Sequence, residues 1–329
     1  SGLNEIELKM EIDSQGNISR FDLLQEPCIK ENPHNNRQTH LIEVLFLNKF
    51  DDVNSSENEI FKSVLIKSCD VTSIDMLIGK KAPEAVILNY NDWGYFKWVI
   101  DRNSINSLKK NLPLVKDNLI KSLVYRSLFD MLRDSRISGF EFYKIIENFL
   151  KEETSEISIP VLLRNLNAAI SNYIPLKFYK KFTSEVFEII WQKLKVQVKL
   201  YNEKSQNANR DLILSLIQNL LMFSTSESHF KIYQNWLEKN IFSIEEIIFE
   251  KGLITVANKF SMVKKIYQSR EISNEKKEEL LEMIIKEDNN SDQSILAKHY
   301  CNAVKPCKEN KQKLFEKFER KFFGISKKF

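Results

Sequence analysis

The sequence predicts a mainly α-helical protein with an N-terminal β domain. A small β-sandwich is expected over residues 1–100, followed by an α-helical superhelix, a solenoid of the HEAT or armadillo kind, over residues 101–329. Apolar residues alternate with polar ones in the first part, whereas from residue 104 they recur with the period of a helix. Only 7 glycines and 7 prolines occur among the 329 residues, which favours long helices.

The N-terminal part shows the alternation that is typical of strands with one buried face. Apolar and charged residues alternate between residues 5 and 13, a turn follows at residues 14–17, and residues 18–24 return as a second strand. Further strands are predicted at residues 41–47, 60–66 and 85–88. Several short strands separated by turn signals predict a small β-sandwich.

Residues 88–101 join the two predicted domains. Tyr95, Phe96 and Trp98 fall within this stretch, and large aromatic side chains of this kind are unfavourable in water. We therefore expect an ordered junction in which these three rings are packed, rather than a free linker.

About ten helices are predicted between residues 104 and 323, from the helical spacing of apolar residues. Capping boxes of the form Ser-x-x-Glu mark helix starts at Ser138 and Ser243, and Ser273 precedes acidic residues that suit a first helical turn. The loops between helices are short and polar, so successive helices are expected to be antiparallel neighbours, as in a superhelix. These loops lie at residues 152–158, 202–209 and 287–292.

Composition argues against several classes of partner. The 49 Lys and Arg residues nearly balance the 45 Asp and Glu residues, and a net charge of +4 indicates neither a nucleic acid nor a membrane surface. No apolar run reaches the length of about 18 residues that a membrane-spanning helix needs. The four cysteines form no Cys-x-x-Cys pair, so free thiols in a reducing, cytoplasmic location are expected.

Motifs that carry catalytic chemistry are missing from the sequence. The four histidines never stand four residues apart, as a zinc-binding helix face requires, and His40-Leu41-Ile42-Glu43 lacks the second histidine. Neither a Gly-x-Ser-x-Gly nucleophile elbow nor a Gly-rich phosphate loop occurs. The residues themselves therefore predict no catalytic residue, no metal site and no cofactor in this chain.

The C-terminal residues 308–329 form a basic amphipathic segment, with eight Lys and Arg residues against three Glu residues. Leu314, Phe315, Phe318 and Phe322 share one helical face. Such a helix either docks its apolar face on the preceding helices or touches acidic lipid or nucleic acid. The first interpretation is favoured, because charged helix faces are usually just solvated.

A more specific signal lies where the two predicted domains meet. Residues 83–92 read PEAVILNYND, residues 94–101 read GYFKWVID, and residues 127–134 read SLFDMLRD. The first two runs resemble the junction of zinc aminopeptidases of the aminopeptidase N and puromycin-sensitive class. The third is similar to the Ala-Leu-Trp-Asp-Met-x-Arg-Asp run of the bacterial-type branch of that class. Weaker similarity extends to Pro33-His34, to residues 71–79 and to residues 303–318.

The resemblance covers residues 5–320 and implies the last two domains of such an enzyme, a β-sandwich and an ERAP-like helical domain. It places the His-Glu-x-x-His zinc site in a catalytic domain that precedes residue 1 in the same chain. Zinc is then a cofactor of a parent metallo-aminopeptidase, a hydrolase that removes N-terminal amino acids from peptides. The present chain is expected to form the wall or lid of the substrate chamber and to contact peptides. By itself it is expected neither to hydrolyse aminoacyl-arylamides nor to hold stoichiometric zinc.

The resemblance indicates four candidate contacts with the substrate chamber: Lys121, Arg126, Arg133 and Lys259. Basic side chains facing the chamber would suit the terminal carboxylate of a peptide. Lys121 and Lys259 stand where the family has arginine, and lysine lacks the fork that binds a carboxylate through two hydrogen bonds. In the structural alternative, Arg133 pairs with Asp130 or Asp134 and ties neighbouring helices together.

Two other functions stay open from the sequence. One is a free-standing α-solenoid scaffold that binds another protein, and the other is a module whose basic tail binds acidic lipid or RNA. An upstream catalytic domain in the full reading frame would favour the aminopeptidase interpretation. A frame that starts near Leu3 would exclude it.

Overall fold

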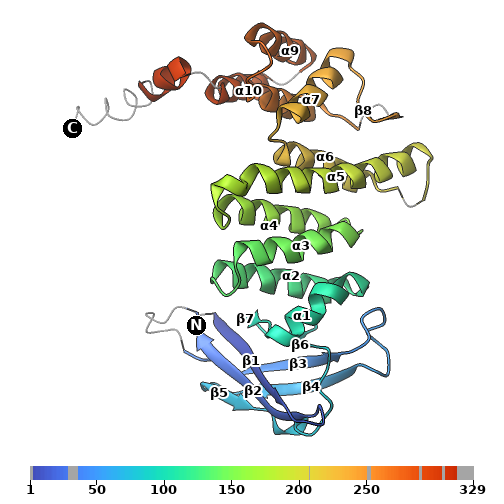
Figure 1. The fold of residues 1–329 in the computed structure, drawn as a ribbon, viewed down its shortest axis with the longest axis vertical. Helices are drawn as coiled ribbons and strands as arrows, with labels where there is room; N and C mark the ends of the chain where they lie inside the picture. Colours follow the sequence, from blue (N-terminus) through green and yellow to red (C-terminus); the bar gives the residue numbers. More distant parts are fainter. Residues whose placement is uncertain are drawn as a thin grey trace. The chain divides into compact units, whose positions relative to one another are not determined.

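The protein is described from a computed structural model. The structure describes residues 3–28, 36–206, 208–249, 253–288, 291–305 and 308–316. Contacts divide the chain into two compact units, Ser1–Ile174 and Pro175–Phe329. The first unit holds strands β1 to β7 and helices α1 to α4, and the second holds the later helices (Figure 1). The sequence-predicted boundary at residue 100 coincides with the change from strand to helix, and as a domain boundary it stays a prediction.

The strands of the first unit form two sheets. The four-stranded sheet has the order β5 (Val71–Ser73), β2 (Ile18–Pro27), β1 (Asn4–Ile12) and β7 (Phe96–Val99). The three-stranded sheet has the order β4 (Glu59–Ile66), β3 (His40–Leu47) and β6 (Ala85–Tyr90). β1 pairs antiparallel with β2 and parallel with β7, a short strand that sequence periodicity did not predict.

The two sheets pack face to face through apolar side chains. Phe21 on β2 lies 6.0 Å from Phe46 on β3, measured between ring centroids, and Phe46 contacts Phe61 on β4 at 4.7 Å. Ile6 and Leu8 on β1 are buried, as the alternation predicted, whereas Ile12 at the end of the strand is 44% exposed. Burial of these apolar side chains stabilises the packing of the two sheets.

The junction between strands and helices is ordered, as predicted, and belongs to the first unit. Phe96 and Trp98 on β7 are buried, with 6% and 4% of their surface exposed. The prediction is wrong for Tyr95, which is 82% exposed. The residue stands in the loop before β7, and burial begins only with the first residue of the strand.

Four helices complete the first unit: α1 (Arg102–Asn111), α2 (Asn118–Arg133), α3 (Gly139–Glu152) and α4 (Ser158–Asn172). Figure 1 shows α2, α3 and α4 stacked side by side, with α2 nearest the strands. The helix start and the hydroxyl cap predicted at Ser138 are confirmed, since its hydroxyl accepts a hydrogen bond from the Glu141 amide. The Glu141 carboxylate accepts from Arg102 and Lys109 and does not complete the predicted capping box. A Cβ added at Gly139 would lie 2.4 Å from the Tyr173 carbonyl oxygen, so the close approach of α3 to the end of α4 requires glycine.

The described part of the second unit contains α5 (Tyr179–Asn202), α6 (Arg210–Phe223), α7 (Glu227–Lys239), α8 (Val256–Ile266), α9 (Asn274–Glu287) and α10 (Ser291–Val304). The predicted loops at 152–158, 202–209 and 287–292 all fall between helices. The predicted cap at Ser273 is confirmed by its bond from the Lys276 amide. A mainly helical chain with N-terminal strands is thus confirmed, while the superhelical order of the helices stays a prediction.

The helix start predicted at Ser243 is wrong. A two-stranded hairpin, β8 (Ser243–Ile244) and β9 (Ile247–Ile248), occupies this position instead. Glu245 has φ 53°, a left-handed conformation that a right-handed helix excludes. The Lys195 ammonium contacts the Glu245 carboxylate at 2.6 Å, which fixes the hairpin against α5.

The basic C-terminal segment is described only to residue 316. Residues 308–316 are helical, and Phe315 is 58% exposed. The predicted apolar positions Phe318 and Phe322 lie outside the described residues, as do Pro33 and His34 of the sequence resemblance. Among the helices in the described ranges, none combines the length and the apolar character that crossing a membrane requires.

Candidate functional site

Lys121 is engaged in a buried ion pair. Its ammonium lies 3.1 Å from the Glu153 carboxylate, and the two side chains are 9% and 2% exposed. The same carboxylate accepts hydrogen bonds from the Tyr125 hydroxyl and from the amides of Thr154 and Ser155. Burial by itself would raise the pKa of Glu153, but the Ser155 amide, Lys121 and Tyr125 prevail and hold it below its usual value. This arrangement ties α2 to the end of α3.

Lys259 on α8 is similarly occupied within the second unit. Its ammonium donates to both carboxylate oxygens of Glu287 on α9, at 2.7 and 2.8 Å, and to the Asn240 side chain at 3.3 Å. The Lys259 side chain is 10% exposed, whereas Glu287 is 45% exposed. Both lysines of the sequence prediction therefore have partners within the chain.

Arg126 and Arg133, the two arginines of the prediction, lie on α2 and are more than half exposed. Arg126 donates to Asp92 at 2.9 Å. Arg133 lies 3.8 Å from Asp130 on the same helix, so this ion pair does not tie two helices together. Asp134 pairs with Lys97 of β7 instead.

A cavity of about 340 Å³ lies between α2 and α4, and we call it the α2–α4 cavity. Its apolar part consists of Tyr125 and Phe129, four residues apart on α2, with Ile157 and Val161. The Tyr125 hydroxyl is fixed by Glu153, as described above, and the Ile157 side chain is 67% exposed. The cavity thus presents apolar surface that includes the buried Tyr125 ring, whose orientation is fixed by its hydrogen bond to Glu153.

Two polar side chains of α4 line the same cavity. Arg164 is exposed, and Asn165 is 6% exposed. Within the described part of the chain, neither side chain has a hydrogen-bond or ion-pair partner. A free guanidinium next to a free amide can bind a carboxylate and a peptide group, respectively. Sequence analysis did not single out either residue.

A second cavity of about 220 Å³ adjoins the first, because Arg126 and Asp130 line both. Its remaining lining comes mainly from residues 92–97, and we call it the loop cavity. Trp93 and Tyr95 in this loop are 69% and 82% exposed. Two large exposed rings in one cavity are unusual for a surface that only faces water.

The loop that carries these rings is tightly held. Asn91 and Asp92 have φ 63° and 56°, two consecutive left-handed conformations that Asn and Asp adopt more readily than other residues apart from glycine. The Asn89 side chain accepts from the Gly94 amide and donates to the Gly94 carbonyl, both at 2.8 Å. Asn91 donates to Glu43 on β3 at 2.7 Å. The rings are therefore presented on a rigid backbone.

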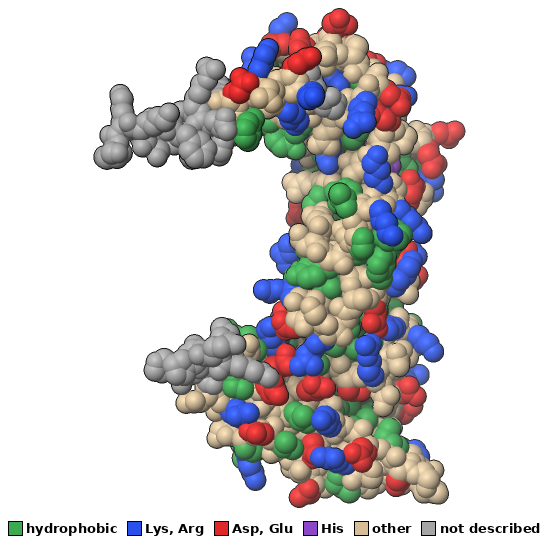
Figure 2. Space-filling model, turned by 60° about the vertical axis from the view of Figure 1, so that its left-hand side comes forward, with side chains coloured by type: hydrophobic (Ala, Val, Ile, Leu, Met, Phe, Trp, Pro, Cys, Tyr) green, Lys and Arg blue, Asp and Glu red, His purple; other side chains and the backbone are tan. Residues whose placement is uncertain are grey.

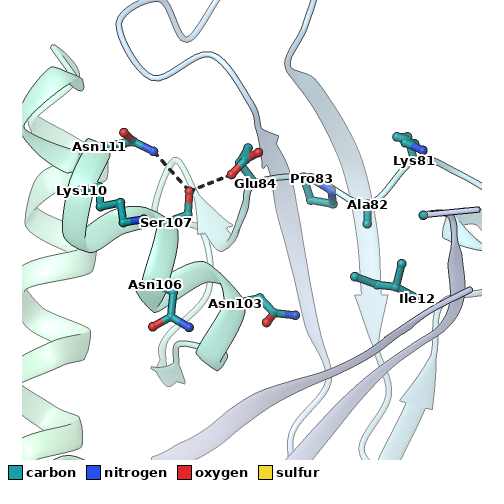
Figure 3. Close-up of a pocket in the computed structure, with 11 residues that line it drawn as sticks. Ile12, Lys81, Ala82, Pro83, Glu84, Asn103, Asn106, Ser107, Lys110 and Asn111 are labelled. Atoms are coloured by element: carbon teal, nitrogen blue, oxygen red, sulfur yellow. Dashed lines mark hydrogen bonds between the residues drawn. The ribbon is translucent and has the colours of Figure 1, made fainter. Parts of the chain in front are cut away.

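A wider depression of about 680 Å³ lies between α1, the β1–β2 turn and the segment before β6. Figure 3 shows that Asn111, Ser107 and Glu84 lie in a row, joined by hydrogen bonds of 3.4 and 3.2 Å. Ser104, also on α1, accepts from the Val86 amide at 2.9 Å. These bonds hold α1 against β6, so the polar groups here have a structural use.

The described residues contain no cluster that would form a metal centre. No group of three or more His, Cys, Asp or Glu side chains in those ranges is placed to hold a metal ion, so the residues do not fit a zinc site. On the face shown in Figure 2, Lys and Arg side chains alternate with Asp and Glu side chains. The two adjoining cavities are therefore the features of the first unit that suit a ligand.

Comparison with known proteins places this architecture in a family. Residues 85–284 match the model of the ERAP1-like C-terminal domain, and since this is more than half of the chain, the protein belongs to that family. Over 104 residues, 32% of the chain, it is 25% identical to Aminopeptidase N of Streptomyces lividans. The match covers 12% of that relative. Both findings support the C-terminal region of an aminopeptidase, and the bacterial-type branch stays a prediction.

Proposed function

We propose that this chain is the C-terminal part of a zinc-dependent aminopeptidase and that the α2–α4 cavity contacts its peptide substrates. The observation that carries the proposal is the cavity itself, in which the free Arg164 guanidinium and Asn165 amide stand beside the Tyr125 and Phe129 rings. The proposal that this cavity belongs to an aminopeptidase is supported by the match to the ERAP1-like C-terminal domain family.

In this proposal, two parts of one protein have different roles in the reaction. An upstream catalytic domain holds the zinc, which polarises the scissile carbonyl and activates water when bound. The helices of the present chain form part of the chamber wall, which limits the space open to a substrate and excludes folded proteins. A cytoplasmic location, and partners that include neither nucleic acid nor membrane, belong to the same proposal.

The chemistry of the cavity suits the far end of a peptide. A guanidinium binds a carboxylate through two parallel hydrogen bonds, so Arg164 would pair with the C-terminal carboxylate or an acidic side chain. The Asn165 amide both donates and accepts, as a peptide group requires. Tyr125, Phe129 and Val161 would take an apolar side chain.

Of the four cations indicated by the sequence, Arg126 alone lines this cavity. Lys121 and Lys259 hold helices together through buried ammonium groups, and their removal is expected to affect folding rather than peptide affinity. Arg133 is exposed and lines neither of the two cavities. We therefore place the main cationic contact at Arg164, with Arg126 beside it.

The test is kinetic and uses the full-length enzyme. Arg164→Ala is expected to raise KM for a long peptide about tenfold, because a hydrogen bond to a charged group contributes roughly 1.5–3 kcal/mol. The kcat/KM for an aminoacyl-arylamide is expected to stay unchanged, since so short a substrate does not reach the cavity. Arg126→Ala should share this pattern in weaker form.

Arg102→Ala serves as the matched control, because it removes an exposed arginine of the same unit from outside both cavities. It is expected to leave both substrates unaffected. Equal losses on both substrates for Arg164→Ala would show that Arg164 only supports the fold. No effect on either substrate would remove it from the chamber.

A further inference from the structure

The loop cavity contains a carboxylate, that of Asp130, which pairs with no donor at hydrogen-bond distance among the described residues. Arg126 donates to Asp92 at 2.9 Å, and Lys97 donates to Asp134 at 3.0 and 2.7 Å, so these four groups form two closed pairs. Asp130 accepts no hydrogen bond from any described residue. It nevertheless lines both cavities, at the point where they meet.

The environment of Asp130 does not favour its charge. The side chain is 22% exposed, and the Arg133 guanidinium lies 3.8 Å away, beyond hydrogen-bond distance. Burial raises the pKa of Asp130 above its usual value, although Lys97, Arg133 and Arg126 oppose this and Asp134 adds to it. Removing the charge should therefore not weaken the fold, so Asp130 has no evident structural use.

The aromatic rings of the loop supply a second and independent observation. Trp93 and Tyr95 line the same cavity as Asp130, and neither ring has a ring or cation partner in the described part of the chain. The loop that carries them follows the left-handed residues Asn91 and Asp92 and is tied back at Gly94 by the Asn89 side chain. A hydrogen-bonded loop that holds two exposed rings beside a carboxylate without a hydrogen-bond donor indicates a built recognition surface.

We propose that the loop cavity is a subsite for a cationic side chain of a bound polypeptide, with arginine as its preferred occupant. The Asp130 carboxylate accepts hydrogen bonds from the guanidinium, and the faces of Trp93 or Tyr95 stack on its plane. Arginine is preferred to lysine because its planar, weakly hydrated fork suits both contacts at once. Arg133 is displaced easily, since it is more than half exposed and makes no hydrogen bond to Asp130.

The proposal rests on the proposed function only in taking a peptide as the ligand. Since Asp130 and Arg126 line both cavities, one peptide can reach Arg164 with an anionic group and Asp130 with a cationic one. The two sites therefore select for different features of the same substrate. A binding measurement on this chain tests the cationic subsite, and kinetics on the full-length enzyme test the chamber, so the two can fail separately.

The experiment compares two peptides that differ in charge alone. Acetyl-Ala-Arg-Ala-amide and its citrulline counterpart, which is nearly isosteric and neutral, are titrated calorimetrically into the 329-residue chain. The arginine peptide is expected to bind roughly tenfold more tightly, because the bonds to Asp130 become charge-assisted. In Asp130→Asn the difference should shrink to less than about twofold, without a fall in Tm.

Two further variants separate charge and stacking from general effects. Asp75→Asn removes an exposed carboxylate of the same unit from outside the cavity, and it should keep the preference for arginine. Trp93→Ala should weaken binding of both peptides, and Trp93→Phe should restore most of it. Equal affinity for the two peptides, or an undiminished preference in Asp130→Asn, would overturn the proposal.

Discussion

Replacing Glu153 with alanine is expected to lower the free energy of unfolding by about 3–5 kcal/mol, because it leaves a buried ammonium without its counter-ion. Lys121 is 7% exposed and has no other acceptor within the described residues. The Tyr125 hydroxyl and two backbone amides lose their acceptor at the same time. Urea denaturation followed by circular dichroism measures the effect.

Glu152→Ala is the matched control for this prediction. Glu152 is the last residue of α3, next to Glu153 in sequence, and its side chain is exposed. Its removal is expected to change stability by no more than about 0.5 kcal/mol. Similar small effects for both variants would show that the Lys121 pair does not hold α2 to α3.

Acidification is expected to destabilise the second unit through His229. This residue on α7 is 6% exposed, its ring stacks on Phe187 with centroids 3.6 Å apart, and its Nδ1 has no hydrogen-bond partner in the described part of the chain. Burial, with a smaller contribution from the charge of Lys265, lowers the pKa of His229 from 6.5 to about 4. The folded state therefore resists protonation.

The sign of the pH dependence follows from that shift. Between pH 6.5 and 4 the unfolded chain binds a proton that the folded chain does not, so the free energy of unfolding falls as pH falls, by about 3 kcal/mol in all. His229→Phe keeps a ring on Phe187 and cannot titrate. In this variant the free energy of unfolding should therefore fall by about 3 kcal/mol less between pH 6.5 and 4 than in the parent protein. Urea denaturation at a series of pH values, followed by tryptophan fluorescence, measures the slope.

His299→Phe provides the comparison, because His299 on α10 is exposed. Its pH dependence is expected to match that of the parent protein. If His229→Phe also matched the parent between pH 6.5 and 4, the account of a neutral, buried His229 would be wrong.

Sequence patterns predicted secondary structure well where many apolar residues shared one period. After Ser138 the apolar residues recur at helical spacing over two turns and more, and α3 forms as expected. After Ser243 the same Ser-x-x-Glu pattern precedes a short run, Ile247, Ile248 and Phe249, and three adjacent apolar residues fit a strand as well as a helix. The hairpin formed because Glu245 adopts a left-handed turn, which the pattern does not encode.

The candidate site was harder to predict, because a cation reveals its partner only in three dimensions. Glu153 lies 32 residues after Lys121, and Glu287 lies 28 residues after Lys259, so neither pair is visible in local spacing. The sequence likewise does not show that Arg164 lacks a partner among the described residues, and no sequence signal distinguishes it from other exposed arginines. Tyr95 is exposed because it lies in the loop just before β7, and the aromatic content of that stretch does not show where the strand begins.

The central claim is that the α2–α4 cavity contacts peptide substrates, and photo-cross-linking tests it most directly. A long peptide with a benzophenone side chain near its C-terminus is irradiated with the full-length enzyme, and the labelled residues are mapped by mass spectrometry. The account predicts label within residues 122–130 or 157–165, competed by unlabelled peptide and strongly reduced in Arg164→Glu. Label confined to other parts of the enzyme, and unaffected by Arg164→Glu, would contradict it.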